Sequence, residues 1–423
     1  MNLMRAVFVA AILLSISAAG QSVNPRLAAE IGRIHAIDNH AHPVIPNGTD
    51  RGFDALPVDD MEPASDPVRV RPDSPDTLQA WRALFDAGTL AEMKARKAAV
   101  KAREGAHYPV WVLDRLGIDV MLANRVAMGG GIAPPRFRWV PYVDALLFPL
   151  DNGKLAAENS DRAKFFPLEE RLLKHYYAEC GVSERPASLD EYLSKVVTPT
   201  LERQKRGGAV AVKYEAAYLR SLEFSPVSKQ DAARVFASAS PSKADYKKLQ
   251  DYLFRYIASE CGRLGMAVHL HTMAGAGSYF HVSGADPLLL EPVLNDPSLR
   301  KTNFVMVHGG WPFTAEITAL LEKPNAYLDF SAQDLIEQPR TLARVIREWL
   351  EFVPEKVMFG TDAYPYSTDL DWEESGWVAS TTGRRALAIA LSGMLDDREI
   401  TYDRAVELAR MVLRDNARKL YGL

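Results

Sequence analysis

The chain has 423 residues, of which 48% are hydrophobic and 25% are charged, as in an ordinary globular protein. A net charge of −4, without a basic tail or a single-sign block, argues against a nucleic-acid partner. The length accommodates two ordinary domains, or one α/β barrel, which needs about 250 residues and tolerates long insertions.

The N-terminus has the pattern of a secretory signal peptide. Arg5 precedes an apolar run from Ala6 to Ser17, and small residues follow up to Gly20. This run is shorter than the roughly 20 residues that a membrane-spanning helix needs. We therefore expect residues 1–20 to be removed, and the protein to be periplasmic or secreted with no membrane contact after cleavage. A retained N-terminal anchor is the alternative.

Eight β-type segments alternate with helical segments along the rest of the chain. This alternation predicts a parallel sheet, and eight strands match a closed (β/α)8 barrel of the TIM type. Helical patterns over 78–113 and 151–206 predict helical insertions after strands 1 and 3, and 229–264 is predicted as a helix. The expected strands are 37–42, 118–123, 137–144, 209–215, 267–271, 304–308, 325–331 and 357–362.

Alternation of side chains along each strand predicts which residues face the inside of the barrel. In the sixth strand, His308, Met306 and Phe304 are expected to face inward, and Val305 and Val307 to face the helices. Each polar residue is then the last inward position of its strand. Barrel enzymes carry their chemistry at that end.

Several of these strand ends carry residues that bind transition metals. His40 and His42 are two apart and share one face of the first strand, so both imidazoles are expected to bind one cation. His271 ends the fifth strand and is the expected third ligand, whereas His269 lies one layer deeper and is expected to be a buried structural histidine.

Three further residues complete the expected site. Asp362 ends the eighth strand, where it is expected to bind the metal and to accept a proton from water. His308 precedes two glycines and is expected either to polarise a substrate carbonyl or to bind a second ion. Lys213 faces inward on the fourth strand, where an unpaired lysine is costly. Carbamylated Lys213 would bridge two ions, and otherwise Lys213 is expected to pair with Glu215 or Asp362 or to bind an anionic substrate.

Arg125, Arg220 and Trp311 are candidates for substrate binding, with surface or packing roles as the alternative. Arg125 follows the second strand, and Trp311 follows the glycines of the sixth strand.

The chain resembles the amidohydrolase superfamily, in particular its amidohydrolase-related branch of metal-dependent hydrolases and decarboxylases. The resemblance covers nearly the whole mature chain and rests on the segments 38–43, 271–272, 308–310, 360–363 and 416–423. It implies a distorted (β/α)8 barrel with a centre of one or two metal ions. His40, His42, His271 and Asp362 would be ligands, and Lys213 falls where some members carry a carbamylated lysine.

We therefore expect residues 21–423 to form a single metal-dependent hydrolase barrel domain. A metal ion lowers the pKa of a bound water, and Asp362 would take its proton during cleavage of an amide, ester or lactone bond. One or two Zn²⁺ ions are expected, with other divalent transition metals as alternatives. A non-oxidative decarboxylase with the same site is the alternative function. The partner is a small molecule, and the sequence leaves homo-oligomer formation open.

Overall fold

The computed structural model describes residues 23–44, 47–49, 51–53, 55–57, 60–61, 65–71, 73–238, 240–367 and 369–423. The expected signal peptide, residues 1–20, lies outside this described part. Among the helices that the structure describes, none combines the length and the apolar character needed to cross a membrane.

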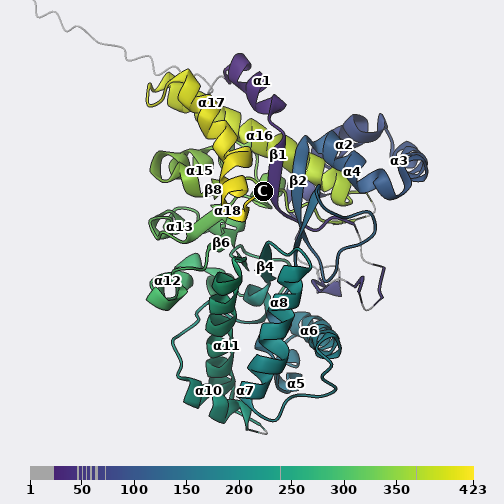
Figure 1. Ribbon diagram of the computed structural model, residues 1–423. Helices are drawn as coiled ribbons and strands as arrows, with labels where there is room; N and C mark the ends of the chain where they lie inside the picture. Colours follow the sequence, from purple (N-terminus) through teal and green to yellow (C-terminus); the bar gives the residue numbers. More distant parts are fainter. Residues whose placement is uncertain are drawn as a thin grey trace, which may run out of the picture.

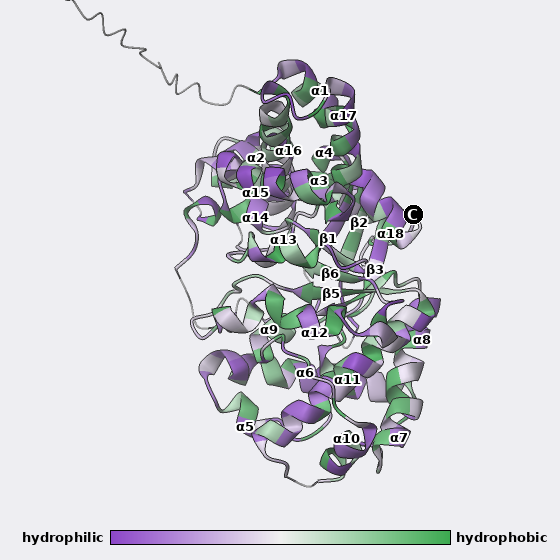
Figure 2. Ribbon diagram, turned by 90° about the vertical axis from the view of Figure 1, so that its left-hand side faces the viewer, coloured by the Kyte–Doolittle hydropathy of each residue, from purple (hydrophilic) through white to green (hydrophobic). Residues whose placement is uncertain are grey.

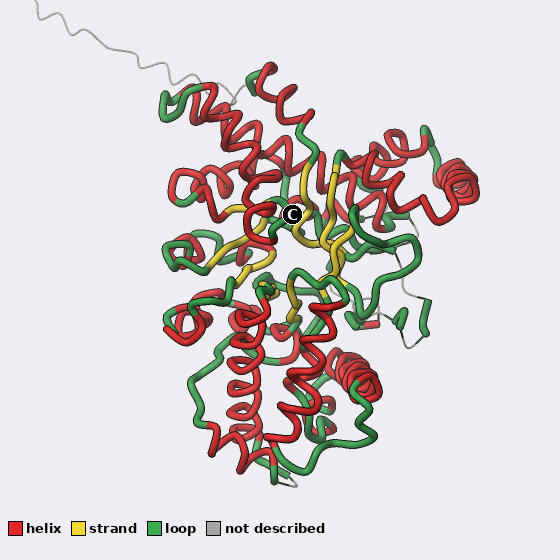
Figure 3. The backbone as a smooth tube through the Cα atoms, viewed as in Figure 1, coloured by secondary structure: helices red, strands yellow, loops and turns green. Residues whose placement is uncertain are grey.

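Parallel strands occupy the centre of the molecule and helices surround them (Figures 1 and 3). The strands are hydrogen-bonded in the orders β1-β2-β3 and β4-β5-β6-β7-β8, and every pair is parallel. They are β1 (Ala36–Ala41), β2 (Ile118–Asn124), β3 (Phe137–Val140), β4 (Ala211–Tyr214), β5 (Ala267–His271), β6 (Phe304–Val307), β7 (Ala326–Asp329) and β8 (Val357–Met358).

Backbone hydrogen bonds join these two sheets at both junctions. The amide of Lys213 donates to the carbonyl of Pro141 beyond β3 at 2.8 Å, and the amide of Asn39 in β1 donates to the carbonyl of Phe359 beyond β8 at 2.9 Å. The strands therefore form a ring, and the predicted (β/α)8 barrel architecture is confirmed.

The helices form where apolar residues recur at helical spacing. In α15, Leu342, Ile346 and Trp349 are buried on one face, and Pro339 occupies the first turn, where its missing amide costs nothing. Figure 2 shows the resulting mixture of hydrophobic and hydrophilic residues along the helices. The helices are α1 (Pro25–Arg33), α2 (Pro75–Phe85), α3 (Leu90–Glu104), α4 (Tyr108–Leu116), α5 (Gly153–Ala156), α6 (Ser160–Glu179), α7 (Leu189–Tyr192), α8 (Thr198–Arg206), α9 (Ala216–Leu219), α10 (Lys229–Phe236), α11 (Lys243–Leu264), α12 (Glu291–Leu294), α13 (Glu316–Leu320), α14 (Gln333–Ile336), α15 (Pro339–Phe352), α16 (Trp372–Asp396), α17 (Tyr402–Arg410) and α18 (Asn416–Tyr421).

Both predicted helical insertions are present. Helices α2, α3 and α4 lie between β1 and β2, and α5 to α8 lie between β3 and β4. The second insertion lies beside α10 and α11 in the lower part of Figure 1. The single helix predicted over 229–264 is in fact two helices, because Ser242 caps a new helix by accepting a hydrogen bond from the amide of Asp245.

One apolar cluster fills the barrel interior at the end away from the polar strand ends. It joins Ile37 of β1 to Ala211 of β4 and Met358 of β8, together with Ala417 of α18. Residues from opposite sides of the ring touch only inside it. Helix α18, which lies in front of the strands in Figure 1, therefore closes this end of the barrel.

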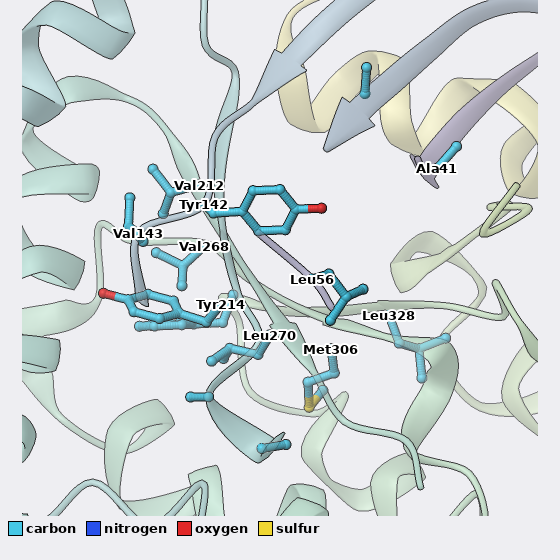
Figure 4. Close-up of a cluster of buried hydrophobic side chains, with 14 of the residues drawn as sticks. Ala41, Leu56, Tyr142, Val143, Val212, Tyr214, Val268, Leu270, Met306 and Leu328 are labelled. Carbon is cyan, nitrogen blue, oxygen red and sulfur yellow. The ribbon is translucent and has the colours of Figure 1, made fainter. Parts of the chain in front are cut away.

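The predicted orientation of the sixth strand was wrong. Val305 and Val307 belong to the interior cluster, whereas Phe304 and Met306 belong to the larger cluster that packs against the helices, part of which Figure 4 shows. His308 still reaches the site, because its backbone adopts a left-handed conformation with φ 71° as β6 ends. The direction of the His308 side chain therefore depends on the turn after β6 and not on the alternation of side chains within the strand.

Candidate metal centre

Three donor atoms meet at the carboxyl ends of β1 and β8. The Nε2 atoms of His40 and His42 lie 3.3 Å apart, and Oδ1 of Asp362 lies 3.2 Å from the first and 3.4 Å from the second. Donors that surround a zinc ion tetrahedrally at about 2.0–2.1 Å are about 3.3–3.4 Å apart. The spacing of these atoms therefore fits a first-row transition-metal ion.

His308 approaches the same point from β6. One potential ligand atom each from His40, His308 and Asp362 lies within 4.8 Å of the others. The ring centroids of His40 and His308 are 4.9 Å apart. The structure thus brings together four of the residues predicted from the strand ends.

Hydrogen bonds determine which ring nitrogen of two histidines faces the cluster. The hydroxyl of Tyr142 lies 2.8 Å from Nδ1 of His42, and the hydroxyl of Ser331 lies 2.9 Å from Nδ1 of His308. When Nδ1 donates to these oxygens, the lone pair of Nε2 is left for a cation. Sequence reasoning identified neither hydroxyl.

The protonation states suit a cation. Burial lowers the pKa of His308 to about 3 and, together with the charge of Lys213, holds the pKa of His40 well below its usual range. Burial favours a raised pKa for Asp362, but interactions with His308, His40 and His42 outweigh it and hold this pKa well below the usual range. The imidazoles of His40 and His308 are thus neutral, and the carboxylate of Asp362 is ionised.

Lys213 and Glu215 extend the cluster along the end of β4. Both are buried, and Nζ of Lys213 lies 3.3 Å from Nε2 of His40 and 3.2 Å from Oε1 of Glu215. Oε2 of Glu215 lies 3.5 Å from Nδ1 of His271. Apart from these ion pairs, the Glu215 carboxylate accepts no hydrogen bond from the described residues. Glu215 is one of the two carboxylates expected from the sequence to pair with Lys213, although it was not predicted as a site residue in its own right.

His271 contacts the ring of His308, whereas the three closest donor atoms belong to His40, His42 and Asp362. Its Nε2 is 2.8 Å from the carbonyl oxygen of Met273, and its ring centroid is 4.7 Å from that of His308. Its Nδ1 faces Glu215. His269 is buried one layer deeper, as expected, with Nε2 2.7 Å from the hydroxyl of Tyr421.

A chain of buried hydrogen bonds connects the C-terminal helix to the site. Tyr421 of α18 donates to the side chain of Asn39, which donates to Asp329 of β7. The hydroxyl of Ser331 donates to Asp329 at 2.6 Å and contacts the ring of His308. This chain determines the orientation of His308 from residues far away in the sequence.

Asp38 anchors the segment that carries Asp362. Its carboxylate accepts hydrogen bonds from the amide of Thr361 at 2.9 Å and from the hydroxyl of Thr361 at 2.6 Å. Burial raises the pKa of Asp38 to about 7. The link between β1 and the end of β8 therefore holds His40 and Asp362 in register.

A cavity of about 470 Å³ lies against the donor cluster, and His42, Glu215, His271, His308 and Asp362 all line it. A cavity of this size accommodates a small-molecule substrate.

Of the three residues predicted to bind substrate, Trp311 lines this cavity. Arg125 and Arg220 do not appear in its lining. The guanidinium of Arg125 donates to the carbonyl of Pro43 at 2.9 Å, and that of Arg220 pairs with Asp251 at 2.5 Å. These contacts hold the loop after β1 and the segment after α9.

A barrel with a histidine and carboxylate cluster at its carboxyl end is the arrangement of a metal-dependent barrel enzyme. Residues 184–423 match the family model described as Amidohydrolase, and the chain belongs to this family. Protein fluG of Emericella nidulans is 24% identical over 230 residues, which cover 51% of this chain and 26% of that protein. The chain therefore spans about a quarter of the length of this relative.

Solved structures share the fold. Glucuronate isomerase from Caulobacter crescentus is 15% identical, with a TM-score of 0.62 over 94% of this chain and 93% of that chain. An uronate isomerase from Bacillus halodurans C-125 is 12% identical, with a TM-score of 0.61 over 95% and 98%. A protein from Lactobacillus casei described as a metal-dependent hydrolase is 16% identical, with a TM-score of 0.59 over 94% and 97%.

Proposed function

We propose that the protein is a metal-dependent hydrolase that cleaves an amide, ester or lactone bond of a small molecule. The observation that carries this proposal is the meeting of His40, His42 and Asp362, with donor atoms 3.2–3.4 Å apart, at the edge of a cavity of about 470 Å³. The cavity gives a small molecule access to an ion held at this point, which a closed structural metal site does not offer.

His40, His42 and Asp362 would hold the metal, with His308 close enough to contribute. The imidazole-rich set favours Zn²⁺ over magnesium, and other divalent transition metals remain alternatives. When bound, such an ion acts as a Lewis acid toward a carbonyl oxygen and lowers the pKa of water.

The metal content follows from the state of Lys213. Its ammonium lies 3.2 Å from the buried carboxylate of Glu215, and carbamylation would replace this cation by an anion. This pairing favours unmodified Lys213 and one ion. Elemental analysis of the purified protein should therefore find about one equivalent, whereas two equivalents with a carbamate adduct in the mass spectrum would contradict this part of the proposal.

The side chains divide the chemistry between them. Asp362, ionised and with its side chain 16% exposed, accepts a proton from water and returns it to the leaving group. His308 donates from Nδ1 to Ser331 and keeps a lone pair on Nε2, so it would serve as a further ligand of the ion and not as a donor to the substrate carbonyl. Tyr142 keeps His42 in place, and the apolar cavity walls exclude bulk water.

Replacement of Asp362 by Asn tests the proton role. Asp362→Asn should retain substrate binding and lose turnover on a panel of amides, esters and lactones. The matched control is Asp403→Asn, an exposed carboxylate in α17 that should leave turnover unchanged. Full turnover of Asp362→Asn would refute the assignment.

Product analysis separates the competing reactions of this fold. Hydrolysis releases an acid together with an amine or an alcohol, whereas decarboxylation releases carbon dioxide and isomerisation changes no mass. Release of carbon dioxide without hydrolysis of any panel member would replace the proposal by the decarboxylase alternative.

Export remains part of the proposal, based on the signal-peptide pattern of residues 1–20. Mass spectrometry of the protein recovered from the periplasm or medium should show a chain that begins near Gln21. Recovery of the uncleaved chain from the cytoplasm would contradict it.

A further inference from the structure

The cavity next to the donor cluster has a polar floor and apolar walls. Glu215, His308 and Asp362 belong to the floor, and the walls are aromatic and aliphatic. Such walls bind apolar groups by removing their surface from water, at about 25 cal/mol per Å². The side chains that define the walls include Met61, Tyr218, Trp311, Ile336, Tyr364 and Tyr366.

Tyr218 forms a rigid aromatic wall directly beside the site. Its ring centroid lies 4.8 Å from that of His271 and 5.0 Å from that of Phe280. Gly275 packs so closely that a Cβ there would lie 2.6 Å from the Tyr218 ring. Because these contacts hold the Tyr218 ring in place, a flat group next to the reacting carbonyl would meet a rigid aromatic surface.

No lysine or arginine lines the cavity in the described part of the chain, whereas Asp66, Glu215 and Asp362 do. Two neighbouring cations are already engaged. Lys213 pairs with Glu215, and Arg69 pairs with Asp76 at 2.8 Å. An anionic substrate group would therefore be buried next to carboxylates without a cationic partner from these side chains.

We propose that the substrate is an amide or ester of an apolar, aromatic carboxylic acid with a neutral or cationic leaving group, and that anionic substrates are rejected. This inference rests on the proposed hydrolase function and names its substrate class. The aromatic acyl group lies against Tyr218, and the leaving group points to Asp66. Rejection arises because an anionic leaving group would lie next to the like charge of Asp66 without a lysine or arginine in the described cavity lining.

Three compounds with the same scissile benzamide bond test the charge preference. N-benzoylethylenediamine is cationic, N-benzoylglycinamide is neutral and N-benzoylglycine is anionic. Their dissociation constants are measured by calorimetry on Asp362→Asn after elemental analysis has shown that the variant retains the metal, and inhibition constants or KM values of the wild type take their place if it does not. We expect the cationic and neutral compounds to bind at least about tenfold more tightly than the anion. Equal or tighter binding of the anion would overturn the proposal.

The acetyl analogues of the same compounds test the aromatic preference. They should bind at least about tenfold more weakly than the benzoyl compounds, because they lose the contact with Tyr218. Equal binding, or no binding by any benzoyl compound, would also overturn the proposal. Hydrolysis of other panel members by the wild type, lost in Asp362→Asn, would leave the hydrolase function intact in that case.

A charge reversal at the cavity provides the second test. Asp66→Lys should improve the binding of N-benzoylglycine by about tenfold relative to N-benzoylethylenediamine. Asp73→Lys, an exposed carboxylate outside the cavity lining, should leave this ratio unchanged. An unchanged ratio in Asp66→Lys would overturn the role given to Asp66.

Discussion

Removal of one hydroxyl group, in Tyr142→Phe, tests the proposed metal centre without altering a ligand. Tyr142 is buried, its ring centroid lies 6.2 Å from that of His42 with the rings inclined by 28°, and its hydroxyl lies 2.8 Å from Nδ1 of His42. Phenylalanine preserves the packing of the ring and loses only the hydrogen bond. His42 is then free to rotate or to adopt the other tautomer, in which Nε2 carries the proton.

Loss of such a hydrogen bond to a ligand histidine typically costs 10- to 100-fold in metal affinity, which corresponds to about 1.4–2.8 kcal/mol. The free energy of unfolding should fall by only about 1 kcal/mol, as for other single hydrogen bonds. We therefore expect a selective loss of metal affinity from Tyr142→Phe.

Competition with a chromophoric zinc chelator measures the affinity on metal-free protein. Tyr192→Phe is the matched control, because Tyr192 is equally buried and its hydroxyl donates to the carbonyl of Leu146 at 2.9 Å, with no histidine involved. Wild-type zinc affinity in Tyr142→Phe, or an equal loss in Tyr192→Phe, would refute the role of Tyr142 in orienting a ligand.

Three further substitutions test the surrounding structure. Lys97 lies 3.0 Å from buried Glu374, so Lys97→Met should lower the free energy of unfolding by about 3–5 kcal/mol in urea titrations, and a loss below about 1 kcal/mol would contradict this. Burial raises the pKa of Glu374 to about 7, so the folded protein favours protonated Glu374. The free energy of unfolding is therefore up to about 3 kcal/mol larger below pH 4.5, and this gain is lost as the pH rises from about 4.5 through about 7. Glu374→Gln should abolish this pH dependence, and an unchanged slope would disprove it. Tyr421→Phe interrupts the hydrogen-bond chain to His308 and should lower kcat about tenfold and alter its pH profile with KM and metal content unchanged; a wild-type profile would show that the chain has no role in turnover.

The fold was predictable because its signals are local. Alternation of β-type and helical segments, with eight strand candidates, identifies the barrel, and the helical patterns after the first and third strands identify the insertions. The orientation of β6 was not predictable from alternation alone. Phe304 and Val305 are both apolar, so either one could face the interior, and the bend at His308 removes the parity argument at the end of the strand.

In the candidate site, too, some residues were predictable from the sequence and others were not. His40, His42 and Asp362 end predicted strands, so short-range patterns reveal them. The residues that orient them are distant in sequence and have no pattern of their own. Tyr421, for example, reaches the site through Asn39, which lies 382 positions away. Contacts of this kind depend on how the ring of strands closes, which no local spacing specifies.

Backbone strain supports the view that this arrangement serves function. Both His308 and Asp362 have positive φ, 71° and 52°, a conformation that costs a non-glycine residue about 1–3 kcal/mol. The amide of His308 donates to Asp329 at 3.0 Å, and that of Asp362 donates to the carbonyl of His40 at 2.8 Å, so neighbouring strands hold both in place. Strand ends selected for stability alone would carry glycine at such positions. An imidazole and a carboxylate stand there instead and point to the same place, which is the arrangement that a bound cation requires.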